Sequence, residues 1–160
     1  MKRILLIIMI IALFFTIGGV AAYKILNKEK EAISAEEFKS VMENKGYTIV
    51  DVTSQYAQYG YIEKAYIAIT NDRQYQVEFY TLTDDEKAVY FYNINKTIFE
   101  NSKQGLTSET NAELKNYCKY TLNNNGKYNV ISRINNTAIY LDVDEEYKDI
   151  IKDLLKEIGY

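Results

Sequence analysis

Hydrophobic and polar positions repeat along this chain with two periods, one typical of helices and one typical of strands. The helical period predicts three helices, in "SAEEFKSVMENKGY" (34–47), "TDDEKAVYFYNINKTIF" (83–99) and "DEEYKDIIKDLLKEIGY" (144–160). At the start of the first two, Ser34 precedes Glu37 and Thr83 precedes Glu86 by three residues. This spacing is that of a capping box, so it marks where each helix is expected to begin.

The alternating period predicts strands in "YTIVDVT" (47–53), "AYIAIT" (65–70), "YQVEFYTL" (75–82), "NYCKYTL" (116–122), "KYNVISRI" (127–134) and "TAIYLDV" (137–143). Residues 100–114 are polar and predict a loop. The fold class predicted is therefore α+β, with an antiparallel sheet of about six strands and three helices packed on one face. At two places in the chain, a predicted strand is followed directly by an acidic helix start. This repetition also fits a diverged duplication of one unit of two or three strands and a helix, written ββ(β)α.

The last predicted hairpin has a second face that differs from its core face. With Asn135–Asn136 as a two-residue loop, Arg133 lies opposite Ala138. Ile131, Arg133 and Tyr140 then share the face that helices on one side of the sheet would leave exposed. A cation beside an aromatic ring and aliphatic groups is typical of a partner surface. The alternative is an ordinary solvent-exposed face with a contact between Arg133 and Tyr140.

The stretch "TSQYAQYGYIEKAY" (53–66) is the densest group of tyrosines in the chain. Tyr56, Tyr59 and Tyr61 are candidate binding residues, since exposed aromatic rings suit sugars and other flat ligands. Packing is the alternative, because tyrosine can bury its ring and leave its hydroxyl at the wet edge. Tyr66 falls in the next predicted strand, and we assign it to the core with Val77 and Phe79.

The N-terminal segment has the pattern of a membrane segment. Lys2 and Arg3 precede an uncharged run from Ile4 to Tyr23, which is long enough to cross a hydrocarbon core of roughly 30 Å. We predict a signal-anchor in residues 1–23, a juxtamembrane linker in 24–33 and an extracytoplasmic domain in 34–160. The alternative is a signal peptide cleaved near Ala22, which would release the domain.

Composition excludes several functions. The chain has no histidine, so serine–histidine and cysteine–histidine nucleophiles are absent, and we predict no catalytic residues and no enzyme. A net charge of −3 and few arginines argue against nucleic acid, and no glycine-rich loop indicates a nucleotide. The carboxylates at 84–86 and 142–146 favour helix starts over a calcium site, so neither a metal nor a cofactor is expected. Cys118 is expected to be a small buried residue, with an intermolecular disulfide as the alternative.

The segments "YNVISRINNTAIYLDVDEEYKDIIKDLLKEIGY" and "VEFYTLTDDEKAVYFYN" resemble uncharacterised small membrane-anchored or secreted proteins of low-GC Gram-positive bacteria. The resemblance covers residues 34–160. It implies an extracytoplasmic setting and brings no activity or site residue with it. The predicted function is a noncatalytic, membrane-tethered domain that contacts an envelope protein or a cell-wall partner. Carbohydrate or peptidoglycan binding by the tyrosines, and an enzyme that uses carboxylates or tyrosine, are the alternatives.

Overall fold

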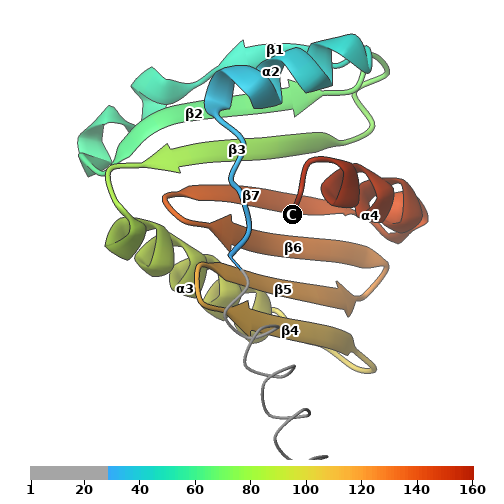
Figure 1. Ribbon diagram of the computed structural model, residues 1–160. Coiled ribbons are helices and arrows are strands. Elements are labelled where there is room, and N and C mark those ends of the chain that lie inside the picture. Colours follow the sequence, from blue (N-terminus) through green and yellow to red (C-terminus); the bar gives the residue numbers. More distant parts are fainter. Residues whose placement is uncertain (1–28) are drawn as a thin grey trace, which may run out of the picture.

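Seven antiparallel strands form one sheet in the computed structural model, which describes residues 29–160 (Figure 1). The strands are β1 (Thr48–Asp51), β2 (Ile62–Ile69), β3 (Gln76–Leu82), β4 (Ser108–Leu114), β5 (Tyr117–Asn124), β6 (Lys127–Ile134) and β7 (Thr137–Asp144). Their order across the sheet is β1-β2-β3-β7-β6-β5-β4. Each half is a meander of sequential neighbours, and the halves join where β3 pairs with β7.

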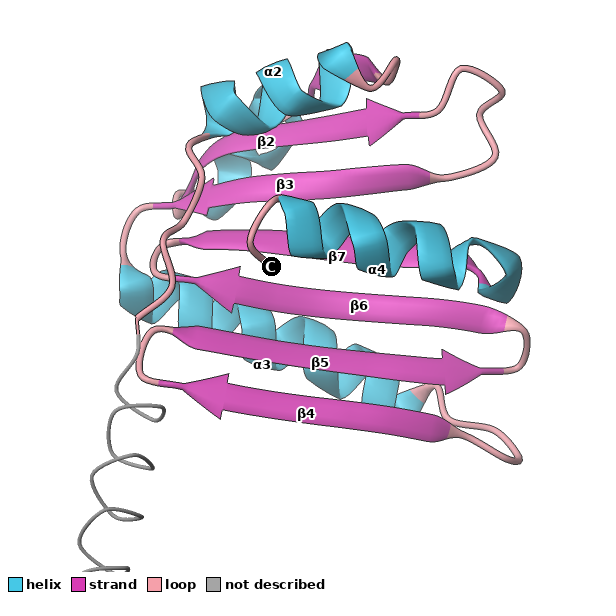
Figure 2. Ribbon diagram, turned by 45° about the vertical axis from the view of Figure 1, so that its right-hand side comes forward, coloured by secondary structure: helices cyan, strands magenta, loops and turns pink. Residues whose placement is uncertain are grey.

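Three α-helices and two 3-10 helices accompany the strands in this part of the chain: α2 (Ala35–Asn44), α3 (Asp85–Asn101), α4 (Lys148–Glu157), η1 (Thr53–Tyr59) and η2 (Glu145–Tyr147). Figure 2 shows α2 and α4 on one face of the sheet and α3 on the other. The α+β class and the antiparallel sheet are confirmed. The expectation that all helices lie on one face is wrong, because α3 crosses behind the sheet after β3.

The helix starts follow local capping chemistry. Ser34 Oγ accepts a hydrogen bond from the Glu37 amide at 3.1 Å, as the capping box predicts. At α3 the cap is Asp84 rather than Thr83, since Asp84 Oδ1 accepts from the Lys87 amide at 2.7 Å. An ionised carboxylate at this position also gains from the helix dipole, which explains the one-residue shift.

Strand β4 occupies the stretch that its polarity predicts to be a loop, so the expectation of about six strands is one too low. Its residues are mostly exposed, and it pairs along its length with β5 at the edge of the sheet. An edge strand with no helix over it needs no apolar alternation, because its backbone bonds alone keep it in the sheet. Hydrophobic periodicity therefore carries no signal for β4.

The face under α2 and α4 holds the largest core. Phe38 of α2 stacks on Phe79 of β3 with ring centroids 4.7 Å apart, and both side chains are fully buried. Ile151 and Leu155 of α4 close the other half of this core. Tyr66 is buried in the same cluster and lies opposite Phe79 in the β2–β3 register, as predicted.

The face under α3 is packed in two smaller clusters, one around Tyr80 and Leu82 and one around Tyr92 and Tyr120. The helices that follow β3 and β7 thus lie on opposite faces. If the two halves were copies of one unit, a two-fold axis perpendicular to the sheet would relate β3 to β7, because these neighbours are antiparallel. Such an axis would place both helices on the same face. The duplication therefore stays a prediction that this arrangement does not support.

Residues 29–33 lie against the domain beside the β4–β5 turn. Asn116 Oδ1 accepts from the Lys30 amide at 3.0 Å, and Asn116 Nδ2 donates to the Lys30 carbonyl at 2.8 Å. Ala32 and Ile33 pack on the core under α2 and α4. The predicted signal-anchor lies outside the described residues. Within residues 29–160, none of the helices has the length and apolar character needed to cross a membrane.

Candidate functional site

A pocket of about 360 Å³ opens between η1, the start of β2 and one side of α3. We call it the tyrosine pocket. Its lining residues are Tyr56, Tyr59, Tyr61, Ile62, Tyr90, Phe91, Ile94 and Asn95. The three tyrosines predicted to bind are therefore brought together, and α3 adds a fourth, Tyr90.

The short helix η1 positions the first two rings. Asp51 Oδ1 accepts from the Thr53 amide at 2.9 Å where η1 begins, and Thr53 Oγ1 accepts from the Ala65 amide at 3.0 Å. Gly60 ends the helix with a φ of 70°, a left-handed conformation that glycine adopts without strain. Because Tyr56 and Tyr59 are three residues apart, both rings lie on one side of η1, as the sequence predicts.

The four rings form a chain of edge and tilted contacts. The Tyr56 and Tyr59 centroids are 6.2 Å apart, and those of Tyr59 and Tyr61 are 5.9 Å apart. Tyr61 and Tyr90 meet at 5.9 Å with their planes at 90°. Rings at these mutual angles line a pocket rather than one flat surface.

Behind the pocket, hydrogen bonds fix the innermost ring. Tyr56 and Tyr80 share a hydroxyl–hydroxyl hydrogen bond of 3.1 Å, and Tyr80 donates to Glu78 Oε2 at 2.5 Å. Burial, followed by the charge of Glu78, raises the pKa of Tyr80 far above its ordinary value. Burial also raises the pKa of Tyr61. Both phenols stay neutral at physiological pH, and no Asp, Glu, Lys or Arg side chain lines the pocket.

The mouth of the pocket is apolar and open. Tyr59 and Tyr90 are each 52% exposed, and Ile94 is 39% exposed. Asn95 is the one lining residue with an amide side chain, and its Nδ2 donates to the Phe91 carbonyl at 2.8 Å. A surface of this kind can bury an apolar or aromatic group from a ligand, since exposed apolar patches mark binding sites.

Sequence reasoning missed Tyr90 and Ile94. Both fall outside the apolar stripe that faces the sheet, and they are four residues apart on the exposed side of α3. The sequence did hold a signal for them, because two large apolar residues at this spacing lie on the polar side of an amphipathic helix. Their partners in η1 are distant in sequence, so the pattern alone does not bring them together.

The other predicted binding residues do not form an exposed surface. Arg133 lies opposite Ala138 as predicted, but Ile131 and Ala138 are fully buried on the face that α3 covers. The expectation of an open outer face at this hairpin is wrong because the second predicted helix packs there. Tyr140 is half-buried and stacks on Phe99 of α3 with centroids 5.2 Å apart.

Arg133 is an unusual buried cation. It is 5% exposed, and its Nη1 donates to the Asn135 carbonyl at 3.0 Å. Its Nη2 lies 3.8 Å from Cys118 Sγ, and its Nε has no hydrogen-bond partner. Within residues 29–160 no carboxylate forms an ion pair with it. Cys118 itself is a partly buried free thiol in the cluster under α3.

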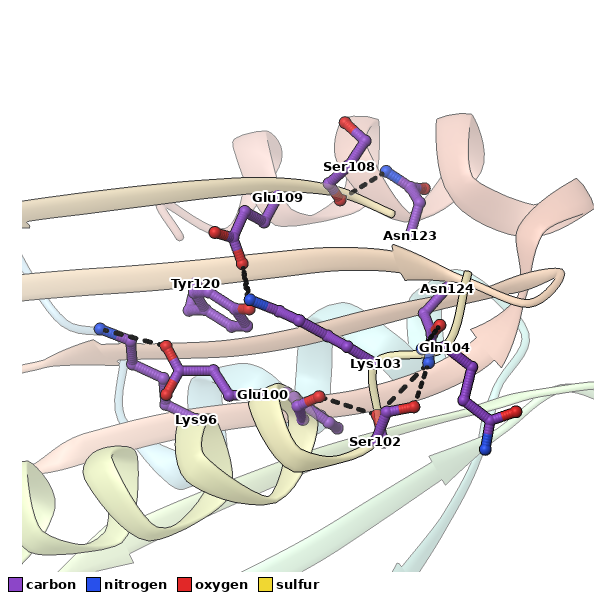
Figure 3. Close-up of polar contacts among 11 residues, drawn as sticks. Lys96, Glu100, Ser102, Lys103, Gln104, Ser108, Glu109, Tyr120, Asn123 and Asn124 are labelled. Carbon is purple, nitrogen blue, oxygen red and sulfur yellow. Dashed lines mark hydrogen bonds and ion pairs between the residues drawn. The ribbon is translucent and has the colours of Figure 1, made fainter. Parts of the chain in front are cut away.

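A second group of polar side chains joins the end of α3 to β4 and β5 (Figure 3). Lys103 forms an ion pair with Glu109, whose carboxylate also accepts from the Tyr120 hydroxyl at 2.7 Å. Asn124 Oδ1 accepts from the Gln104 amide at 2.9 Å, and its Nδ2 donates to the Ser102 carbonyl at 2.8 Å. These groups satisfy one another, so they hold the loop after α3 and leave little for a ligand.

Among the described residues, no three Asp, Glu or Cys side chains are grouped as metal ligands. Comparison of the chain with protein-family models, with curated proteins and with solved structures found no match in any of the three. The tyrosine pocket is therefore assigned from its own geometry and chemistry.

Proposed function

We propose that this chain is a noncatalytic domain tethered to the outer side of the cell membrane, and that it binds an envelope protein through the tyrosine pocket. The tether rests on the uncharged run from Ile4 to Tyr23. The observation that carries the binding proposal is the open apolar pocket lined by four tyrosines. The partner would insert an apolar or aromatic side chain, as anchor residues of protein interfaces do.

The lining favours a protein over a polar small molecule. Tyrosine is enriched at protein interfaces because its rigid ring gives a large contact area and its hydroxyl tolerates water. Tyr59 and Tyr90 have exposed rings, while Tyr56 is fixed from behind by Tyr80. A pocket that is already formed in the unbound state orders few side chains on binding, which lowers the entropic cost of association.

Photocrosslinking tests the proposal in the full chain in its native membrane. A benzophenone amino acid at position 59 should give one discrete adduct with a protein. Ile94→Asp should abolish this adduct, because a carboxylate would be desolvated at the mouth of the pocket. Ile94 is partly exposed, so the substitution should leave the circular dichroism of the protein unchanged.

The matched control places the same benzophenone at position 150 on α4. Ile150 is 54% exposed, close to the 52% of Tyr59, but it lies on the opposite face of the sheet. Position 150 should give no comparable adduct. If both positions capture the same proteins, or if Ile94→Asp leaves the adduct at position 59 intact, the tyrosine pocket is not the contact surface.

Carbohydrate binding is a second candidate, favoured by the two exposed tyrosine rings, which can cover the CH groups of a sugar. Its weakness is the single amide in the lining, because sugars need several hydrogen-bond partners. A pulldown of the full chain with purified cell wall tests it. Binding that falls in Tyr61→Ala and is competed by free glycan would replace the protein partner with a glycan.

A further inference from the structure

Strands β3 and β7 separate over part of their length. Their paired residues run from Thr81↔Thr137 to Glu78↔Tyr140, although β3 begins at Gln76 and β7 continues to Asp144. The pairing therefore ends at Glu78 and Tyr140. Beyond this point a fork opens in the middle of the sheet, where backbone groups of both strands lack each other as partners.

Tyrosines close the fork on the face that carries α4. Tyr75 and Tyr147 have ring centroids 4.8 Å apart, and the Tyr147 hydroxyl donates to Gln74 Oε1 at 2.6 Å. The Tyr75 hydroxyl shares a 2.7 Å hydrogen bond with that of Tyr47. On the other face, α3 crosses the sheet to one side of the fork (Figure 1).

A hollow of about 240 Å³ lies at this fork, separate from the tyrosine pocket. We call it the fork hollow. Its lining residues are Ile69, Arg73, Gln74, Tyr75, Gln76, Glu78, Tyr140 and Asp142. It holds one cation, from the β2–β3 turn, and two carboxylates, from β3 and β7. Tyr140 is the cross-strand partner of Glu78, and Asp142 follows it by two residues on the same face of β7. Burial and the nearby charges of Asp142 and Glu78 raise the pKa of Tyr140 to about 12.

The charged side chains of the fork hollow do not form ion pairs with one another. Within residues 29–160, neither Arg73 nor Asp142 takes part in an ion pair or a side-chain hydrogen bond. Glu78 accepts from Gln76 Nε2 at 2.8 Å and from Tyr80, which orients it without neutralising it. A guanidinium and two carboxylates thus line one small hollow without an ion pair among them, while Lys127, which is paired with Asp144, lies near Asp142.

Arg73 occupies a backbone position that does not suit it. Its φ is 59°, and its amide donates to the Thr70 carbonyl at 2.9 Å to close the turn. Hairpins with a turn of this kind usually carry glycine at the left-handed residue. The other non-glycine residues with positive φ in this part of the chain are Asn125 and Asn135, and asparagine tolerates the conformation better. Strain of this kind often persists where a side chain has a function.

From the opposed charges around one hollow, we propose that the fork hollow binds a small zwitterion with an amino-acid head group. The Arg73 guanidinium takes the carboxylate as a paired donor. Glu78 and Asp142 take the ammonium, which also lies against the Tyr140 ring. Both contacts are needed, because the hollow has one more negative charge than positive and a carboxylate alone would be repelled.

Titration of the full chain with alanine, propionate and ethylamine tests this site. Propionate lacks the ammonium of alanine, and ethylamine lacks its carboxylate. Alanine should bind at least about tenfold more tightly than either fragment, measured by the shifts of the Gln76 and Tyr140 amides in NMR spectra. Asp142→Asn should weaken alanine binding severalfold.

Arg73→Gly gives the sharpest variant, because it separates binding from folding. Removal of the guanidinium should weaken alanine binding about tenfold or more, while glycine relieves the left-handed strain and raises the melting temperature. Asn125→Gly is the matched control at another left-handed turn, where asparagine already tolerates the conformation, so it should leave both the melting temperature and alanine binding nearly unchanged. The proposal is overturned if ethylamine binds as tightly as alanine, if alanine does not bind, or if Arg73→Gly retains full affinity. None of these outcomes depends on the tyrosine pocket.

Discussion

The two faces of the sheet are closed to different degrees. On one face, α2, α4 and residues 29–33 cover a single continuous core. On the other, α3 alone crosses the sheet, and the buried side chains divide into two clusters. The tyrosine pocket lies beside α3 on this second face, and Glu78 and Tyr140 line the fork hollow from the same face.

The difference indicates how this domain separates stability from binding. Two helices on one face bury enough apolar area to hold the sheet together, so the other face need not be fully covered. Aromatic and charged side chains can then stay exposed around α3. If this division is correct, substitutions on the closed face should act on folding, and those around α3 should act mainly on binding.

The largest expected effect on stability comes from a substitution on the closed face, which α2 and α4 cover. Phe79→Ala removes a fully buried ring that stacks on Phe38, and it should lower the free energy of unfolding by about 3–5 kcal/mol. Tyr59→Ala on the other face should change it by less than about 0.5 kcal/mol, because the ring is half exposed. Urea denaturation followed by circular dichroism measures both. Equal losses would end the distinction between the two faces.

A smaller effect, an increase in the free energy of unfolding, is expected from a substitution under α3. Arg133→Met replaces a buried guanidinium, whose Nε has no partner, with an unbranched apolar side chain that ends near the position of Nε. The free energy of unfolding should rise by about 1 kcal/mol or more, since burying a charge without an ion pair is costly. Lys152→Met on the exposed side of α4 is the control and should have little effect. A clear loss of stability in Arg133→Met would mean that the α3 face depends on this cation.

The smallest effect concerns the support of the tyrosine pocket at acid pH. Hydrogen bonds from Thr53, followed by the one from Lys64, lower the pKa of Asp51 to about 2. The folded pKa lies below the unfolded value of about 3.9, so Asp51 stabilises the fold above about pH 4. This contribution should be lost as the pH falls from about 4 to 2.

The amide signal of Thr53 in NMR spectra should follow this titration, and Asp51→Asn should remove it. The effect on overall stability should be slight, because Asp51 is exposed and solvent screens its charge. A Thr53 signal that does not change between pH 6 and pH 2 would show that η1 is held without Asp51.

Parts of the candidate site could be predicted from local pattern. Tyr56, Tyr59 and Tyr61 are close in sequence, and Gly60 ends the turn between them, so their proximity follows from a few residues. Tyr90 and Ile94 could not be added, since their contact with η1 depends on how α3 crosses the sheet. The surface expected at Arg133 failed for the same reason, because α3 covers it.

The fold divides in the same way. Alternation of apolar and polar residues indicates strands that have a buried face, and the register of β6 with β7 follows from the two-residue turn at Asn135–Asn136. β4 carries no such signal, because edge pairing is satisfied by backbone atoms that every residue has.

The sequence by itself determined the α+β class, most strands, the three helices and the position of Tyr66 in the core. These depend on periodicity and capping, which act over a few neighbouring residues. Only the tertiary structure decided which face each helix covers, where β3 and β7 separate, and which side chains α3 buries or leaves open. Those outcomes depend on contacts between residues far apart in the chain, whose free energies no local pattern contains.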